Sequence, residues 1–215
     1  MSVAALRVGP ALPSRPPPVT SAPLCLQPPT PFESIRSTVV VSGIAVLRSR
    51  SLFEAYEARL ESAMRDVLVS AVAGTWLPVD AGMQHFAALD ALDLGADVSY
   101  EIGAASGKRF GSTVWGTLVR VAMAAGGANP WVVLSAYDRM FGRGFRGGGF
   151  AVWQLGPKEA AVELQGVPFC RYAYFRDAFR GAHSSLLELF SSTVYVREVP
   201  DTARPSGFTV RISWV

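Results

Sequence analysis

Three side chains in this sequence have types that could carry nucleophilic or acid–base chemistry: Cys170, His85 and His183. A thiol at a helix N-terminus can ionise at a lowered pKa and attack as a thiolate, with a histidine as its base. Cys170 begins a predicted helix, and His183 on that helix lies about 20 Å away by helical rise, so the two cannot form a dyad. The surrounding aromatic residues favour a core position for Cys170. We therefore predict no catalytic residue, and a protein that is not an enzyme.

Metal coordination is not supported by residue spacing. Cys25 and Cys170 are the only cysteines, and neither belongs to a zinc-site pattern. His85 could in principle lie over a pocket, but an isolated histidine is more typical of a hydrogen-bonded, partly buried residue. The sequence predicts no metal-binding and no cofactor-binding residue.

A glycine pattern at residues 142–147 matches G-x-G-x-x-G, the signature of a dinucleotide-binding turn. In such a site the glycines follow a strand and open a helix, whose N-terminal amides bind the pyrophosphate. Here the order is reversed, because a predicted helix ends at Phe141 and a strand begins near Phe150. We expect GRGFRGGG at 142–149 to be a flexible connector.

The composition indicates one soluble domain. Of the 215 residues, 50% are hydrophobic and 17% are charged, which is enough for one sizeable core. No segment approaches the roughly 20 uninterrupted apolar residues that cross a bilayer, so no membrane span is expected. The net charge of only +3, spread along the chain, does not favour nucleic acid as a partner. Two isolated cysteines and the absence of a secretory apolar segment favour the cytoplasm.

Proline concentrates at the N-terminus, where nine of the fifteen prolines fall within residues 1–31. Proline fixes φ, removes a backbone donor and favours an extended chain over a packed one. We predict a proline-rich arm or linker over residues 1–37 and a single α+β domain over residues 38–215. The arm is expected to be a solvated tether, although its PxxP-like segments could dock into an aromatic groove.

The first half of the predicted domain is mainly helical. Thr38–Leu47 is β-branched and apolar, which favours a strand but leaves a short buried helix open. Apolar residues at three- and four-residue steps predict an amphipathic helix over 51–68. Asp80 is expected to cap a helix that ends at Gly95, residues 97–125 read as further helix, and Asn129-Pro130 predicts the start of a helix that ends at Phe141.

In the second half of the domain, apolar residues recur at every second position and no longer at every third or fourth. Alternation over 150–155 and 160–165 predicts an antiparallel hairpin. A long helix over 169–190 and two strands over 192–199 and 208–215 follow. The expected fold is α+β: a helical half, then a β-β-α-β-β antiparallel sheet with the long helix packed on it.

Four segments resemble a known superfamily: VVVSGIAVLRSR at 39–50, GSTVWGTLVRVAM at 111–123, VELQGVPFCRY at 162–172 and GFTVRISWV at 207–215. The superfamily groups haem-based nitric-oxide sensor domains, 4-vinyl-reductase domains and the vesicle-tethering TRAPP subunits. Within it, the chain looks most like an uncharacterised paralogous family of myxobacteria. None of the four segments is a catalytic motif, so the resemblance informs the fold more than the function.

Two features of the superfamily are missing from this sequence. Members with metal chemistry often carry cysteines near the last hairpin, whereas VREVPDTARPSGFTVRISWV contains none. Haem sensors of this fold use an axial histidine together with a Tyr-x-Ser-x-Arg motif that binds the propionates, and that motif does not occur here. The resemblance therefore implies neither a metal nor a haem in this chain.

Two function classes remain after these exclusions. The resemblance implies a non-enzymatic ligand-sensing or regulatory module, with an apolar pocket between helices and sheet for a small apolar ligand. The alternative is a protein-interaction or scaffold subunit, in which the helical face and the proline-rich arm bind a protein partner or a second copy. For the first class we expect aromatic residues to line the pocket, namely Phe86, Trp115, Trp131, Tyr137, Phe175 and Phe179.

Overall fold

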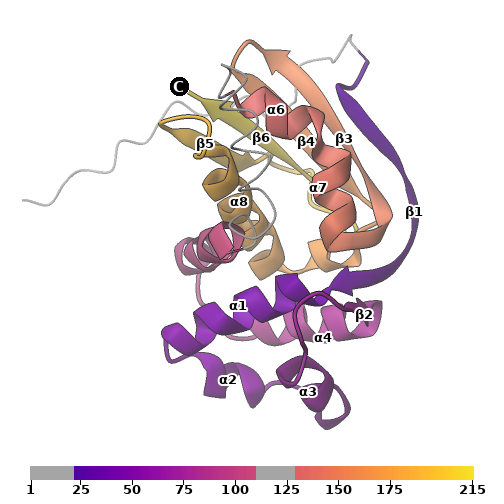
Figure 1. Cartoon of the computed structure of the whole chain (residues 1–215), viewed down its shortest axis with the longest axis vertical. Helices are drawn as coiled ribbons and strands as arrows, with labels where there is room; N and C mark the ends of the chain where they lie inside the picture. The colour runs from indigo at the N-terminus through magenta and orange to yellow at the C-terminus, as the bar shows by residue number, and fades with distance from the viewer. Residues whose placement is uncertain (1–21, 110–128) are drawn as a thin grey trace, which may run out of the picture.

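The computed structural model describes residues 22–109 and 129–215. Its centre is a six-stranded sheet in the order β2-β1-β3-β4-β6-β5, in which every neighbouring pair is antiparallel. Helices α1 to α4 and the short strand β2 form one half of the molecule, and the other strands with α7 and α8 form most of the other half (Figure 1). The predicted α+β class is confirmed. The strands are β1 (Cys25–Arg36), β2 (Trp76–Pro78), β3 (Phe145–Gly156), β4 (Glu159–Gln165), β5 (Val194–Glu198) and β6 (Phe208–Trp214).

The predicted hairpin and the two C-terminal strands are confirmed as β3–β4 and β5–β6. Val152 of β3 lies opposite Val162 of β4, which in turn lies opposite Val210 of β6. These three valines are fully buried or nearly so, while alternate positions such as Arg211 are partly exposed. One face of the sheet therefore belongs to the core, as alternation of period two requires.

Strand β1 corrects the interpretation of residues 25–36 as part of a solvated arm. The segment pairs with β3 on one side and with β2 on the other. Its register shifts between Gln27 and Thr30 and again between Thr30 and Ser34, where Pro28, Pro29 and Pro31 cannot donate ladder hydrogen bonds. Residues 1–21, the remainder of the predicted arm, lie outside the described residues.

The glycine-rich segment at 142–149 is likewise not a flexible connector. Its first residues end α7 and the rest open β3, directly beside the prolines of β1. Gly147 has φ +83°, and a methyl group there would overlap the backbone of Pro31 and Phe32. A methyl group on Gly149 would overlap Gln27 and Pro29. The glycines thus let an irregular, proline-containing strand come close to its neighbour.

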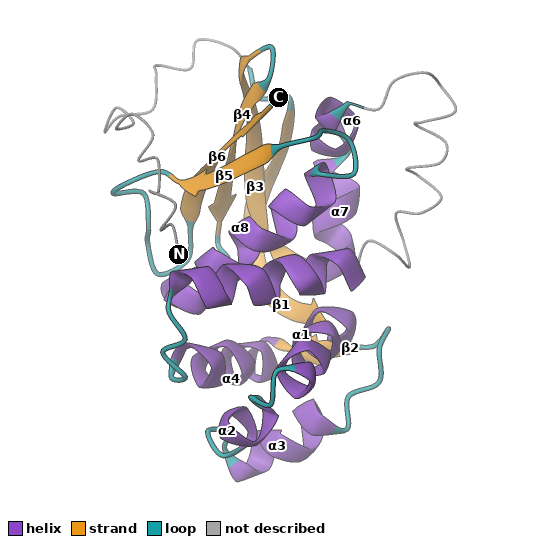
Figure 2. Ribbon diagram, turned by 90° about the vertical axis from the view of Figure 1, so that its left-hand side faces the viewer, coloured by secondary structure: helices purple, strands orange, loops and turns teal. Residues whose placement is uncertain are grey.

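The helical half contains α1 (Ser37–Ser49), α2 (Phe53–Glu57), α3 (Ser62–Val69) and α4 (Val79–Asp90), all labelled in Figure 2. The strand favoured for Thr38–Leu47 is wrong, because this segment is α1. Val40, Ile44 and Leu47 recur at helical spacing and are buried together, so tertiary packing overrides the β propensity of the valines.

Three further helix predictions are corrected in detail. The single helix expected over 51–68 is interrupted between α2 and α3, although Tyr56, Leu60 and Leu68 are still buried. Asp80 lies in the first turn of α4 and not at its N-cap, which is Pro78. Of the helix expected over 97–125, residues 96–109 are helical and the rest lies outside the described residues.

The Asn129-Pro130 start signal is confirmed, since the Asn129 side chain accepts a hydrogen bond from the Trp131 amide at 3.1 Å. The helix divides at Ala136 into α6 (Pro130–Ser135) and α7 (Tyr137–Gly144). The long late helix begins with a 3-10 turn, η1 (Pro168–Arg171), and continues as α8 (Ala173–Leu187). None of the described helices is long and apolar enough to cross a membrane.

Candidate functional site

An apolar cavity of about 150 Å³ lies between the helical half and the sheet-bearing half. Its walls come from α1, α4, the helix of residues 96–109, α7, the first residue of β3, and α8. Most of the lining is aromatic, aliphatic or glycine. The described lining residues are Val39, Ser42, Gly43, His85, Phe86, Gly103, Ser106, Gly107, Tyr137, Met140, Phe141, Gly144, Phe145, Tyr174, Phe175, Ala178, Phe179, Ala182, His183 and Leu186.

Four of the six residues that the sequence suggested for a pocket line this cavity: Phe86, Tyr137, Phe175 and Phe179. Phe86 meets Phe175 edge to face with ring centroids 4.9 Å apart, which links α4 to α8 across the two halves. Phe175 then contacts Phe179 one turn along α8. Edge-to-face contacts of this kind fix ring orientation beyond what apolar burial alone requires.

Of the two tryptophans in that set, Trp131 is described and is not a lining residue. Trp131 donates from its indole nitrogen to the carbonyl of Pro157 at 2.9 Å and packs edge to face on Trp214. It therefore fastens α6 to the β3–β4 turn and the last strand, away from the lining residues. Trp115 lies outside the described residues.

One wall of the cavity depends on small residues in two crossing helices. A methyl group on Gly103 would overlap the backbone of Ala178, and one on Gly181 would overlap the carbonyl of Tyr100. The helix of residues 96–109 therefore crosses α8 at close backbone contact. Sequence reasoning anticipated close helix approach from the alanine and glycine content, but it did not identify α8 as the partner.

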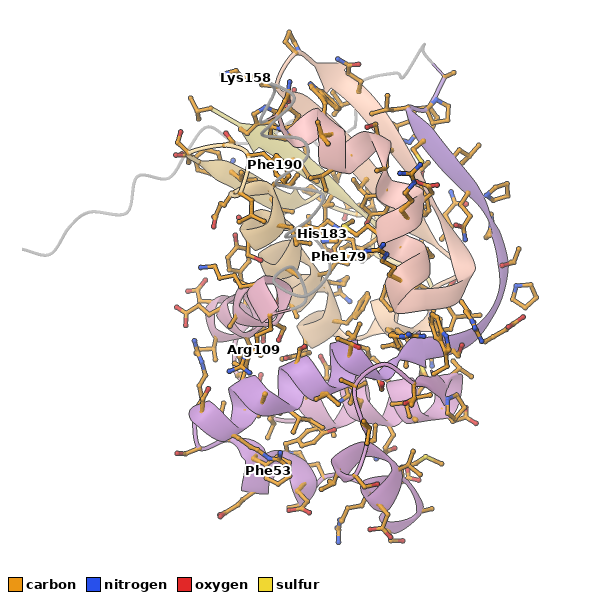
Figure 3. All side chains as sticks on the ribbon, in the orientation of Figure 1. Phe53, Arg109, Lys158, Phe179, His183 and Phe190 are labelled. Carbon is orange, nitrogen blue, oxygen red and sulfur yellow. The ribbon has the colours of Figure 1, made fainter. Side chains whose placement is uncertain are left out.

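On the sheet side of the cavity, His183 of α8 has both ring nitrogens engaged. Nδ1 lies 2.8 Å from the carbonyl oxygen of Phe179, which can only accept, so Nδ1 carries the proton. Nε2 lies 3.0 Å from the Tyr137 hydroxyl, which therefore donates to it and joins α7 to α8. Phe179 and His183 are labelled between these two helices in Figure 3. Burial lowers the pKa of His183 to about 4, so the ring is neutral at pH 7.

On the helical side, His85 of α4 has one nitrogen engaged. Nδ1 lies 2.7 Å from the hydroxyl of Tyr56, a fully buried residue of α2. His85 itself is only 2% exposed, and burial lowers its pKa to about 3. Sequence reasoning anticipated a hydrogen-bonded, partly buried histidine. It missed the Tyr56 partner and the position on the cavity wall, which have no signal in the spacing of the sequence.

Cys170 does not have the environment of a nucleophile. It lies fully buried in η1, and burial raises the pKa of its thiol to about 12, so the thiol is protonated at pH 7. Burial outweighs the lowering effect of the nearby Arg176 guanidinium on this pKa. Among residues 22–109 and 129–215, no three His, Cys, Asp or Glu side chains cluster as a metal site.

No protein-family model and no curated protein matches this sequence. Among solved structures, the unliganded Fe(II) H-NOX protein from K. algicida matches with a TM-score of 0.60 at 11% identity, covering 84% of this chain and 97% of that chain. An oxygen-binding H-NOX domain related to soluble guanylate cyclases gives a TM-score of 0.51 at 17% identity, with 84% and 95% covered. The fold is that of the H-NOX domains. At these identities the likeness concerns the fold, and the finer assignment to a myxobacterial family stays a prediction.

A further H-NOX structure, solved to probe haem distortion, matches with a TM-score of 0.56 at 16% identity and covers 84% of this chain and 95% of that chain. The described residues of this H-NOX-like chain do not fit a haem. A cavity of about 150 Å³ has the size of cavities that accept a benzene-sized molecule. The described lining contains no arginine or lysine to pair with propionates. We therefore derive no haem chemistry for this site.

Proposed function

We infer that this protein is a non-enzymatic ligand-sensing module that binds a small apolar molecule in the cavity between its two halves. The observation that carries the proposal is the cavity itself, which is bounded by aromatic side chains of α4, α7 and α8. A ligand there would touch the helical half and the sheet-bearing half at once. Its binding energy would favour one relative packing of the two halves, which is the physical basis of a sensor.

The apolar space of about 150 Å³ is available to a ligand because the side chains that line it do not fill it. The lining atoms forgo the van der Waals contacts that a packed core would make there. A ligand that fills the space recovers contacts that the empty protein lacks.

The alternative of a scaffold subunit gains no comparable support from the described residues. Its arm was expected to be free to bind a neighbour, but residues 25–36 are already paired inside the sheet as β1. The rest of that arm lies outside the described residues. A protein partner or a homo-oligomer, and a cytoplasmic location, stay predictions.

Benzene and xenon are the probes that test the proposed function. We expect either probe to shift the NMR signals of lining residues such as Phe86 and Phe175 in a saturable manner, and to raise the melting temperature. Val39→Phe places a larger side chain into the cavity and should abolish the response. Val67→Phe makes the same change on the exposed side of α3 and should leave the response intact. Wild-type protein that responds to neither probe would refute the proposal.

A further inference from the structure

Among the described residues, the imidazole edge of His85 that faces the cavity is a chemical feature that an apolar ligand alone would not use. The tautomer of this ring follows from Tyr56, whose hydroxyl has His85 Nδ1 as its hydrogen-bond partner. If Nδ1 carried the proton, the buried Tyr56 hydroxyl would have to accept, and its own proton would lose this partner. A buried donor without an acceptor is strongly unfavourable. Tyr56 therefore donates to Nδ1, and the ring proton of His85 is on Nε2.

Gly43 of α1 leaves this N–H uncovered. A methyl group at Gly43 would lie 3.6 Å from Nε2 and 3.8 Å from Cε1 of His85, at ordinary contact distance. With hydrogen in place of that methyl group, the Nε2 edge borders the open volume that Gly43 and His85 both line. Among the described residues, Nε2 of His85 has no hydrogen-bond partner. A side chain that is 2% exposed thus presents an unpartnered donor to an apolar cavity.

Most other polar lining groups bond within the chain or can rotate to do so. The Tyr174 hydroxyl, which also lines the cavity, has no hydrogen-bond partner among the described residues, but it can rotate and can accept as well as donate. The Tyr137 hydroxyl and both nitrogens of His183 bond within the chain. Serine hydroxyls on helices, such as Ser42 and Ser106, can rotate to bond carbonyls of their own helix, whereas an imidazole N–H is fixed by its ring. His85 therefore presents to the cavity a donor whose direction is fixed by its ring.

We propose that the cavity recognises a small, mainly apolar molecule carrying one hydrogen-bond acceptor, a carbonyl or ether oxygen or an aza nitrogen, which accepts from Nε2–H of His85. This inference rests on the proposed function, because it names the ligand class of the same cavity. The apolar walls would hold the hydrocarbon part, and the single donor would fix its orientation. Buried donors of this kind discriminate strongly against analogues that lack the acceptor.

Benzene and pyridine form a matched pair of probes, because they have the same shape and differ in one acceptor nitrogen. The quantity to measure is the ratio of their dissociation constants at pH 7.5, by NMR titration of the full chain. We expect His85→Phe to reduce the preference for pyridine relative to benzene by about tenfold, the value of one hydrogen bond. In wild-type protein, pyridine should also shift the ¹⁵N signal of His85 Nε2, and benzene should not.

Gly43→Ala tests the same contact without removing the histidine. Its methyl group would cover Nε2 at an ordinary distance and would replace glycine inside a helix, so the variant should fold at least as well as wild type. We expect it to lose the pyridine preference. Gly144→Ala is the matched control, since its methyl group also enters the lining but meets Val39 at 3.8 Å. It should weaken both probes alike and leave their ratio unchanged.

The outcomes separate the two proposals. If benzene binds wild-type protein but the ratio is the same in His85→Phe and Gly43→Ala, the acceptor proposal is overturned and the ligand-sensing proposal stands. If neither probe binds, both proposals fail. If Gly144→Ala reduced the preference for pyridine over benzene as much as Gly43→Ala does, the acceptor proposal would also be overturned. The effect would then come from cavity size alone.

Discussion

Two buried histidine–tyrosine pairs face the same cavity from opposite halves of the molecule, and they differ in one hydrogen bond. His183 bonds to Tyr137 through Nε2 and to the carbonyl of Phe179 through Nδ1. His85 bonds to Tyr56 through Nδ1. The extra carbonyl on α8 makes the first pair a closed structural link between helices. Among the described residues no equivalent acceptor lies beside Gly43, so on our proposal the second pair keeps a donor for a ligand.

The largest expected effect comes from truncating each histidine in turn. His183→Ala removes a ring that lies 3.8 Å, centroid to centroid, from Phe179 and leaves the Tyr137 hydroxyl without its acceptor. We expect it to lower the free energy of unfolding by about 4 kcal/mol. His85→Ala should cost less, about 2–3 kcal/mol, because only one of its nitrogens bonds within the chain.

Urea denaturation of both variants measures this difference. The comparison between the two pairs would be wrong if His85→Ala proved the more destabilising change. A double variant sharpens the comparison. In His85→Phe the Tyr56 hydroxyl is left without an acceptor, so adding Tyr56→Phe should recover part of the lost stability.

The next effect is a loss of stability in mild acid. Burial lowers the pKa of His85 to about 3 and that of His183 to about 4, whereas both titrate near 6.5 in the unfolded chain. Below pH 6.5 the unfolded chain binds more protons, so stability is full above that pH and falls toward the folded-state values. Between pH 7.5 and pH 5.5 each histidine should cost about 1.4 kcal/mol, or roughly 3 kcal/mol together.

Chemical denaturation at the two pH values measures this loss in wild-type protein and in the His85→Phe/Tyr56→Phe variant. The variant should retain about half of the pH dependence, from His183. Burial also raises the pKa of the Asp177 carboxyl, which adds to the pH dependence. Because Asp177 is present in both proteins, its contribution cancels in the difference between them. A variant with the full wild-type dependence would show that His85 is not buried as a neutral ring.

The smallest expected effect is at Trp131, outside both pairs. Trp131→Phe keeps an aromatic contact with Trp214 but removes the hydrogen bond to the Pro157 carbonyl, which lies at an exposed position. We expect a loss of less than about 1 kcal/mol and no change in benzene affinity. A strong effect of this variant on benzene affinity would extend the site beyond the described lining.

Local patterns in the sequence predicted the elements whose signals lie within a few residues. The hairpin over β3 and β4 follows from strict alternation, and the start of α6 follows from Asn129-Pro130, which caps it. The assignment of Thr38–Leu47 as a strand failed because side-chain propensity is weak compared with the burial of one face of α1. At the cavity, helical spacing identified aromatic residues on inward faces, such as Phe175, but could not separate them from Trp131.

The sequence by itself determined the α+β class, the period of most elements and the apolar character of the residues that meet between the two halves. Only the tertiary structure decided that residues 25–36 form a strand that packs against glycines of β3. It also decided that both ring nitrogens of His183 have hydrogen-bond partners, and that one ring nitrogen of His85 faces open space beside Gly43. The physical reason is the range of the interactions. Period and capping act over a few residues, whereas the partners of these groups lie far away along the chain and meet only when the core forms.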